Sequence, residues 1–184
     1  MTEEELMMAV CRGDQSAYQA VVKLHLKSIS HYAFRILGNQ KDTEDITQEA
    51  FLKLWTNAAR WNPEKSKLTT WLHRITHNLC VDYIRKHSRV QTQDSFDENI
   101  ESSEFDDADA DENNRKVKLL NEAIKQLPQN QRSALALCHY QGFSNKEAAA
   151  IMNISVKALE SAIARAKRSL RQLVTEESDQ RQKL

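Results

Sequence analysis

The chain has 184 residues, with 26 Lys/Arg, 26 Asp/Glu, three glycines and two prolines. It is long enough for one large domain or two small ones, and the scarcity of helix breakers predicts an all-α fold. No apolar run approaches the roughly 18–20 residues that span a bilayer, so we expect no membrane insertion. The N-terminus is acidic rather than basic, and the three cysteines are far apart, so we expect no signal peptide, no disulfide framework and a cytoplasmic location.

The zero net charge hides a strong segregation along the chain. Residues 1–90 carry +3, residues 91–114 carry −10 and residues 115–184 carry +7. The middle segment lacks apolar periodicity, which is typical of a flexible acidic linker between two small helical domains. Such a linker is either a solvated tether or a mimic of nucleic acid that occupies a basic channel, and the composition does not separate the two.

The first helices are predicted from their apolar periodicity and their breakers. Residues 3–12 form a short helix, and Gly13-Asp14 marks a turn. Residues 16–37 form a long helix, after which Gly38 stands where a helix-terminating glycine belongs.

The next helix is predicted to open at Asp42 with an acidic first turn. Ile46, Ala50 and Leu54 form its inner stripe. Its other face is acidic and polar, which indicates either a solvated surface or a docking face for a basic partner. The residues of this outer face are Asp42, Asp45, Gln48, Glu49 and Leu52.

A polar, basic loop at 62–67 separates that helix from one that begins near Leu68 and ends near Arg89. The inner stripe predicted for this second helix is Trp71, Leu72, Ile75, Leu79, Tyr83 and Ile84. Its other face presents Arg74, Asn78 and Arg85. Cations and an amide beside an aromatic-flanked loop suit an unpaired nucleic-acid strand, although an ordinary core helix with a charged face is the alternative.

His73, His77 and Cys80 lie at i, i+4 and i+7 on the same helix. The spacing resembles that of a metal site, but no fourth ligand is nearby and the residues interleave with core positions. We therefore expect packing or surface roles, no metal and no cofactor. A metal- or redox-responsive protein is a weaker alternative.

Helical periodicity returns at Arg115, with a predicted inner stripe of Val117, Leu120, Ala123, Ile124 and Leu127. A helix over 131–140 follows. Ser144 and Glu147 predict a capping box for a helix through Met152. After a turn at Asn153, Ser155 caps a last helix of about 18 residues.

Two helices joined by a three-residue turn are typical of a helix-turn-helix. The second helix turns basic and polar side chains outward, including Lys157, Ser161, Arg165 and Arg168. In a helix-turn-helix the start of this helix enters the major groove and later cations hold phosphates. An αα-hairpin with a basic surface is the alternative.

Three stretches together resemble the sigma-70 family of bacterial transcription initiation factors, in its extracytoplasmic function group. They are DTEDITQEAFLKLW, the run ending in TTWLHRITHNLCVDYIRK, and LPQNQRSALALCHYQGFSNKEAAAIMNISVKALESAIARAKRSLRQ. The resemblance implies sigma region 2 over residues 1–90, a linker over 91–114 and sigma region 4 over 115–184. It also implies a protein that binds core RNA polymerase, through its clamp helices and flap, and promoter DNA, and that an anti-sigma factor holds inactive.

The resemblance also implies roles for single residues. Asp42, Asp45, Gln48, Glu49 and Leu52 would contact the polymerase clamp helices. The residues implied at the −10 element are Asn62, Lys65, Ser66, Lys67, Trp71, Arg74, Asn78 and Arg85. Those implied at the −35 element are Ser144, Lys157, Glu160, Ser161, Arg165 and Arg168. Glu160 departs from the family, where many relatives carry a basic residue.

The sequence therefore favours an alternative sigma factor over two other classes. The first is a helix-turn-helix regulator of duplex DNA with an N-terminal sensor or dimerisation domain, which would need no acidic docking helix. The second is an enzyme, for which no Ser/His/Asp set, phosphate-binding glycine loop or metal cluster is visible.

Overall fold

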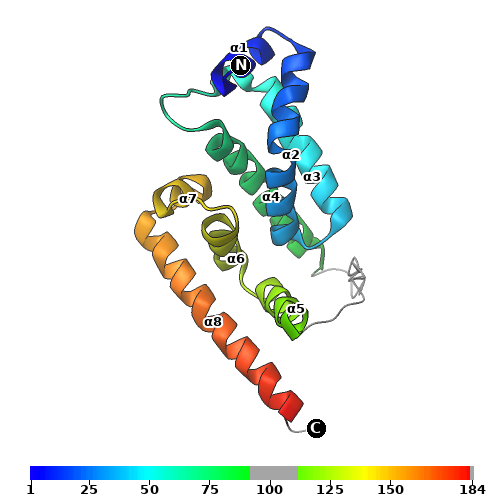
Figure 1. Ribbon diagram of the computed structural model, residues 1–184, viewed down its shortest axis with the longest axis vertical. Helices are drawn as coiled ribbons and strands as arrows, with labels where there is room; N and C mark the ends of the chain where they lie inside the picture. The colour runs from blue at the N-terminus through cyan, green and yellow to red at the C-terminus, as the bar shows by residue number, and fades with distance from the viewer. Residues whose placement is uncertain (92–111, 183–184) are drawn as a thin grey trace.

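The computed structural model describes residues 1–91 and 112–182, and all regular elements in that part of the chain are helices, as predicted. The N-terminal half contains α1 (Glu3–Cys11), α2 (Gln15–Leu37), α3 (Gln40–Thr56), the 3₁₀ turn η1 (Ala58–Arg60) and α4 (Leu68–Gln91). The C-terminal half contains α5 (Glu112–Lys125), α6 (Gln129–Leu135), the π-helical turn η2 (Ala136–Tyr140), α7 (Asn145–Met152) and α8 (Val156–Gln182). Figure 1 shows the two groups of helices one above the other.

Short-range hydrogen bonds set the starts of the first helices. Thr2 and Glu5 form a capping box on α1, and the Asp14 carboxylate accepts hydrogen bonds from the Ser16 and Ala17 amides in the first turn of α2. Gly38 ends α2 with a φ of 70°, the left-handed conformation that glycine adopts without strain. The prediction that α3 opens at Asp42 is wrong by two residues, because the Asn39 side chain caps the helix from Gln40.

The N-terminal core lies between α2, α3 and α4, with α1 packed across α2. Its largest fully buried side chains include Tyr32, Ile29, Leu54, Leu68 and Leu72. None of the helices in the described residues is both long and apolar enough to cross a membrane.

The buried side of α4 differs from the predicted stripe. Trp71, Ile75, Tyr83 and Ile84 are only partly buried. Their places in the core are taken by His73 and Thr76, which are fully buried, and by His77, which is 5% exposed. The stripe predicted from apolar residues alone is therefore rotated around the helix relative to the side that is buried. The reason is that the buried polar side chains find hydrogen-bond partners inside the protein.

The C-terminal helices also depart from the predicted bounds. α5 begins at Glu112, so residues 112–114 of the predicted linker are helical, and residues 92–111 lie outside the described residues. Val117 is 54% exposed and Leu120 is 37% exposed, so only Ala123, Ile124 and Leu127 of the predicted stripe are buried. α6 begins two residues before Gln131, because Pro128 ends the preceding turn and leaves an extended backbone there.

Two further differences concern the last helices. The predicted helix over 131–140 changes into the π-helical turn η2, which rotates the side chains that follow Leu135 relative to a regular helix. α8 extends to Gln182, about nine residues past its predicted end. No glycine or proline follows Leu173, so nothing local stops the helix.

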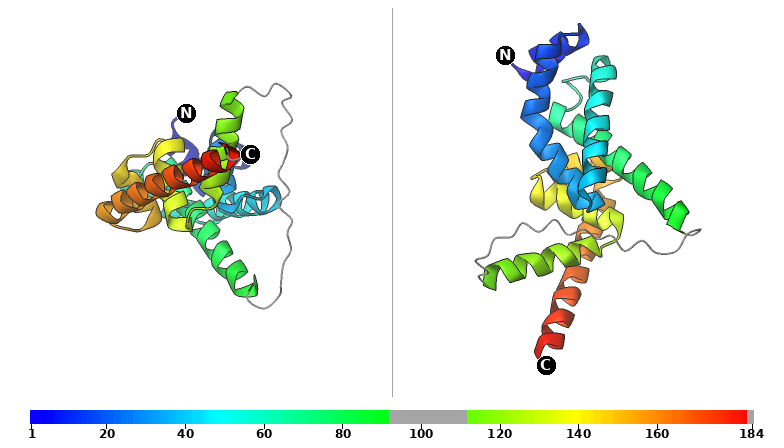
Figure 2. Two further views of the ribbon diagram at one scale, coloured as in Figure 1. Left: turned by 90° about the horizontal axis from the view of Figure 1, so that it is seen from below. Right: turned by 90° about the vertical axis from the view of Figure 1, so that its right-hand side faces the viewer.

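The two halves are in direct contact. α7 packs on α4, and α6 and η2 pack on α2. The right-hand view of Figure 2 shows α5 and the long α8 crossing below this contact, away from α1.

Candidate nucleic-acid interface

The acidic outer face predicted on α3 is present. Asp45, Gln48, Glu49 and Leu52 are exposed, and Leu52 keeps 57% of its surface in contact with solvent. The buried side of the helix carries Thr43, Ile46, Thr47, Ala50, Phe51 and Leu54. A single exposed leucine among carboxylates is compatible with a solvated surface as well as with a protein contact.

Asp42 differs from the rest of this face because it is half-buried and tied to α4. The Tyr83 hydroxyl on α4 donates a hydrogen bond to the Asp42 carboxylate. Burial raises the pKa of Tyr83 above its ordinary value, and the hydrogen bond and the negative charges of Asp42 and Asp45 raise it further. Asp42 therefore links the acidic helix to the helix that carries the cations.

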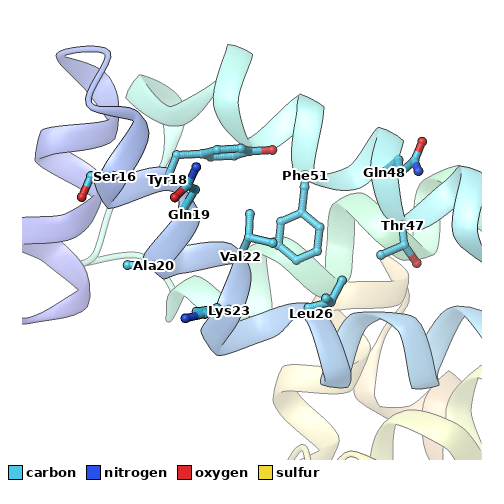
Figure 3. A pocket seen from close by; sticks show the side chains of 10 residues that line it. All are labelled: Ser16, Tyr18, Gln19, Ala20, Val22, Lys23, Leu26, Thr47, Gln48 and Phe51. Carbon is cyan, nitrogen blue, oxygen red and sulfur yellow. The ribbon is translucent and has the colours of Figure 1, made fainter.

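An apolar groove lies beside the acidic face, between α2 and α3. It encloses about 690 Å³ and is lined by Ser16, Tyr18, Gln19, Ala20, Val22, Lys23, Leu26, Thr47, Gln48 and Phe51. Figure 3 shows Val22, Leu26 and Phe51 meeting at its centre, with Gln48 at one end. Sequence reasoning missed this groove, although Leu26, which is 46% exposed, stands on the polar side of the α2 stripe.

The loop before α4 is closed by its own hydrogen bonds. The Trp61 indole N–H donates to the Ser66 carbonyl at 3.1 Å, and the Glu64 amide donates to the Asn62 side-chain oxygen at 2.9 Å. Lys65 and Lys67 remain exposed at the loop surface. The loop is therefore a preformed turn with two outward cations, and Trp61 determines its shape.

α4 carries the other residues predicted at the −10 element. Arg74, Asn78 and Arg85 are exposed, and Trp71 is half-buried beside the loop. The exposed cations and the amide run along the solvent-facing side of α4. The structure thus exposes cations on both the loop and the helix that follows it.

The metal alternative on α4 is not favoured by the geometry. The His77 Nδ1 accepts a hydrogen bond from the Tyr32 hydroxyl at 2.8 Å, and the His73 Nδ1 lies 2.7 Å from the Thr69 carbonyl, to which it donates. Burial lowers the pKa of each histidine to about 4, so both rings are neutral at physiological pH. Across residues 1–91 and 112–182, no three His, Cys, Asp or Glu side chains gather as metal ligands would.

The helix-turn-helix is formed as predicted by α7, a three-residue turn and α8. Ser144 caps α7, since its hydroxyl accepts from the Glu147 amide at 3.1 Å, and Asn153 adopts a left-handed φ of 55° in the turn. The Ser155 hydroxyl accepts from the Ala158 amide at 3.1 Å at the start of α8. Ser144 is engaged in the cap, so its hydroxyl is not free at the surface.

The outer face of α8 presents the predicted contacts to solvent. Lys157, Glu160, Ser161, Arg165 and Arg168 are all exposed. Leu159, Ala162 and Ala166 form the buried side of the helix. A helix with this separation of cations from apolar residues has the charge pattern of a DNA-reading helix.

Comparison with known proteins identifies both halves. Residues 21–90 match Sigma-70 region 2, and residues 118–170 match Sigma-70, region 4. The ECF RNA polymerase sigma factor SigE of Mycolicibacterium smegmatis is 29% identical over 174 residues, which cover 91% of this chain but 66% of that protein. SigW of Bacillus subtilis is 29% identical over 171 residues, covering 88% of this chain and 91% of that protein.

Solved structures agree with these relatives. The sigma factor RpoE of Bartonella quintana, determined in complex with the anti-sigma factor NepR, has a TM-score of 0.70 and 26% identity, covering 86% of this chain and 96% of that chain. CnrH, determined with the cytosolic domain of CnrY, shares the fold with a TM-score of 0.69. The two matched regions, in this order and with these relatives, show that the chain belongs to the extracytoplasmic function group of the sigma-70 family.

Proposed function

We propose that the protein is an alternative sigma factor that binds core RNA polymerase and directs it to promoters through the −10 and −35 elements. The observation that carries the proposal is the pairing of two surfaces in one chain. An acidic docking helix and a cation-bearing helix stand together in α3 and α4, and a helix-turn-helix follows in α7 and α8. Family membership supports the same function.

The outer face of α3 is proposed to bind the clamp helices of the polymerase. Asp45 and Glu49 would meet cations of the partner, and Leu52 would be buried against it, with Gln48 at the edge of the neighbouring groove. A partner helix on this face therefore also reaches Leu26 and Phe51. Asp42 supports the surface from its hydrogen bond with Tyr83.

The loop at 62–67 and the outer face of α4 are proposed to capture the opened −10 strand. Lys65, Lys67, Arg74 and Arg85 would hold phosphates, while Asn78 would contact a base and Trp71 would stack beside it. Unstacking a base costs a few kcal/mol, and specific contacts worth about 1–3 kcal/mol each offset that cost. The free energy that opens the DNA would therefore come from binding contacts to the unpaired strand.

The outer face of α8 is proposed to read the −35 duplex. Lys157 and Ser161 stand near the start of the helix, where base edges are reached, and Arg165 and Arg168 stand where phosphates are held. The Glu160 carboxylate would accept a hydrogen bond from cytosine N4 and repel the phosphates around it. We infer that Glu160 makes binding more specific for the −35 sequence and lowers the affinity for DNA of any sequence.

Members of this family act as initiation factors and leave the chemistry to the polymerase, so we propose no enzymatic activity for this chain. We also propose an anti-sigma factor as a protein partner, since the similar RpoE structure was determined with one. These roles imply that the protein works in the cytoplasm, where promoter DNA is found.

The test is to mix the purified protein with core RNA polymerase that lacks sigma and to run size-exclusion chromatography. We expect co-elution at one to one and specific transcripts from genomic DNA. If the protein binds duplex DNA but never co-elutes with the polymerase, the proposal fails and the helix-turn-helix regulator takes its place.

A further inference from the structure

The start of α8 carries a branched apolar side chain among outward residues that are mostly polar. Val156 is the first residue of α8 and is 41% exposed. Lys157, Glu160 and Ser161 follow it on the exposed side of the helix. A single exposed valine is ordinary on a protein surface, so the place of this one relative to its neighbours decides whether it has a role.

The other exposed apolar residue at this junction has a structural role, which Val156 lacks. Ile154 is 37% exposed and precedes Ser155, whose hydroxyl caps α8 by accepting from the Ala158 amide at 3.1 Å. Ile154 therefore stands where an apolar side chain packs on the fourth residue of a helix, which here is the fully buried Leu159. Val156 belongs to no such motif, and it has no polar atom with which to cap the helix. Its side chain is thus available to a partner.

The geometry of the helix places Val156 beside Glu160. Residues four apart lie about 40° apart around a helix and about 6 Å apart along it. Val156 and Glu160 therefore stand on one flank of the outward face, whereas Lys157 and Ser161 stand about 100° further round, on the other flank. Figure 1 shows the start of α8 at an outer edge of the molecule, joined to α7 by the turn. Both flanks are exposed there.

An apolar side chain in the major groove can recognise one feature of a base edge. Thymine carries its C5-methyl group there, and no other base of unmodified DNA presents a methyl group. The carboxylate of Glu160 matches the amino donor of cytosine N4. Because an α-helix fills the width of the major groove, the two flanks of its outward face approach different strands. The flank that carries Val156 and Glu160 is therefore suited to pyrimidines of one strand.

We propose that Val156 is a specificity-determining residue, which selects a thymine of the −35 element by covering its C5-methyl group. This thymine lies on the same strand as the cytosine that Glu160 reads. It is within about two base pairs of that cytosine, since about 6 Å along the helix corresponds to at most two steps of roughly 3.4 Å. The inference rests on the proposed DNA-reading role of α8, but it does not require polymerase binding.

The contact has a signature that separates it from the charged contacts of α8. Covering one methyl-sized apolar group changes affinity about fourfold. The valine carries no charge, so its loss should leave the dependence of DNA affinity on salt unchanged. Glu160→Gln, in contrast, should change affinity most at low salt, because it removes repulsion of phosphates.

The experiment first selects −35 duplexes from a randomised pool with the full chain, both alone and bound to core polymerase. We expect the wild-type protein to prefer thymine at one position and Val156→Ala to lose that preference only. The matched control is Val174→Ala, the same change near the other end of α8 at 36% exposure, which should keep every preference. Equal melting temperatures of the three proteins exclude loss of the fold as the cause.

The second step removes the methyl group from the DNA instead of the protein. Deoxyuridine in place of the selected thymine should weaken binding by the wild-type protein and by Val174→Ala about fourfold, measured by fluorescence anisotropy. Binding by Val156→Ala should not weaken further, because its partner for the methyl group is already absent.

The thymine assignment is overturned if deoxyuridine weakens all three proteins equally, or if Val156→Ala keeps the full preference for thymine. A pool that yields no preferred sequence, with or without polymerase, overturns it as well. If the positions affected by Val156→Ala and Glu160→Gln lie more than two base pairs apart, the shared flank is wrong. A protein that selects duplexes but never binds polymerase would count against the sigma function, while the methyl test still decides the role of Val156.

Discussion

The indole N–H of Trp61 donates a hydrogen bond to the carbonyl of Ser66 across the loop that precedes α4. This bond fixes the direction of Lys65 and Lys67 relative to the helix that carries Arg74 and Asn78. The side chain is half-buried, so its ring packs on the core while its N–H shapes the loop.

Trp61→Phe keeps an aromatic ring at this position but removes the five-membered ring of the indole together with its N–H. We expect promoter opening to weaken about two- to tenfold, since one hydrogen bond contributes about 0.5–1.5 kcal/mol, while binding of a duplex −35 fragment stays unchanged. Permanganate reactivity of unpaired thymines reports opening, and fluorescence anisotropy reports duplex binding. Equal losses in both assays would show that Trp61 acts only through general stability.

Asp45→Arg reverses a charge on the exposed acidic face of α3. We expect polymerase affinity to fall at least tenfold, because close charge pairs at interfaces have coupling energies of about 1.5–7 kcal/mol. The control is Glu4→Arg, the same reversal on the exposed surface of α1. Size-exclusion or anisotropy titration with core polymerase measures the loss, and intact assembly of Asp45→Arg would remove α3 from the clamp contact.

Leu26→Ser tests whether a polymerase helix on α3 reaches the neighbouring groove. The side chain is 46% exposed, so the fold should tolerate the change. Covering a leucine contributes roughly 1.5–3 kcal/mol when burial is complete, so a partly covered one should cost about three- to tenfold in affinity. Leu24→Ser, at 61% exposure and outside the groove lining, is the matched control. Identical affinities for the two variants would exclude the groove.

Glu160→Gln removes the negative charge from the DNA-facing side of α8. We expect general duplex affinity to rise several-fold at low salt, because phosphate repulsion is lost, and discrimination at one −35 position to fall. Binding selections with randomised −35 duplexes, repeated at two salt concentrations, measure both effects. If base preference is unchanged at every position, Glu160 reads no base.

His77 should make the stability of the fold depend on pH. Its pKa is about 4 in the folded protein because of burial, against about 6.5 unfolded, so the folded state binds fewer protons. The stabilisation is complete above about pH 6.5 and is lost as the pH falls toward 4. By pH 5 the free energy of unfolding should have fallen by about 2 kcal/mol. Urea unfolding from pH 7.5 to pH 5 measures it. His77→Gln should remove the share of this pH dependence that His77 contributes and leave the share of His73, whose pKa burial also lowers to about 4. The exposed His31→Gln is the control.

Local signals in the sequence predicted the helices and most of their ends. Gly38, Ser144, Asn153 and Ser155 act where short-range rules place them, because a cap or a turn depends on neighbours only a few residues away. The outward residues of α3, α4 and α8 were predicted for the same reason, since a helix with one apolar stripe must face the solvent with the other side. The longer α8 was missed because the absence of a breaker is a weak signal.

The tertiary structure alone decided the inner side of α4 and the contact between the halves. His73 and His77 count as polar in any pattern, and they are buried because Tyr32 and Ser28, more than forty residues away in sequence, supply their hydrogen-bond partners. The groove lined by Val22, Leu26 and Phe51 likewise forms only where α2 and α3 pack together, so neither segment alone indicates it. Sequence by itself determined which surfaces can bind, since composition and period are local. The packing of helices that are distant in sequence decided which of these surfaces are joined, buried or exposed. Those outcomes depend on contacts between segments, which no single segment contains.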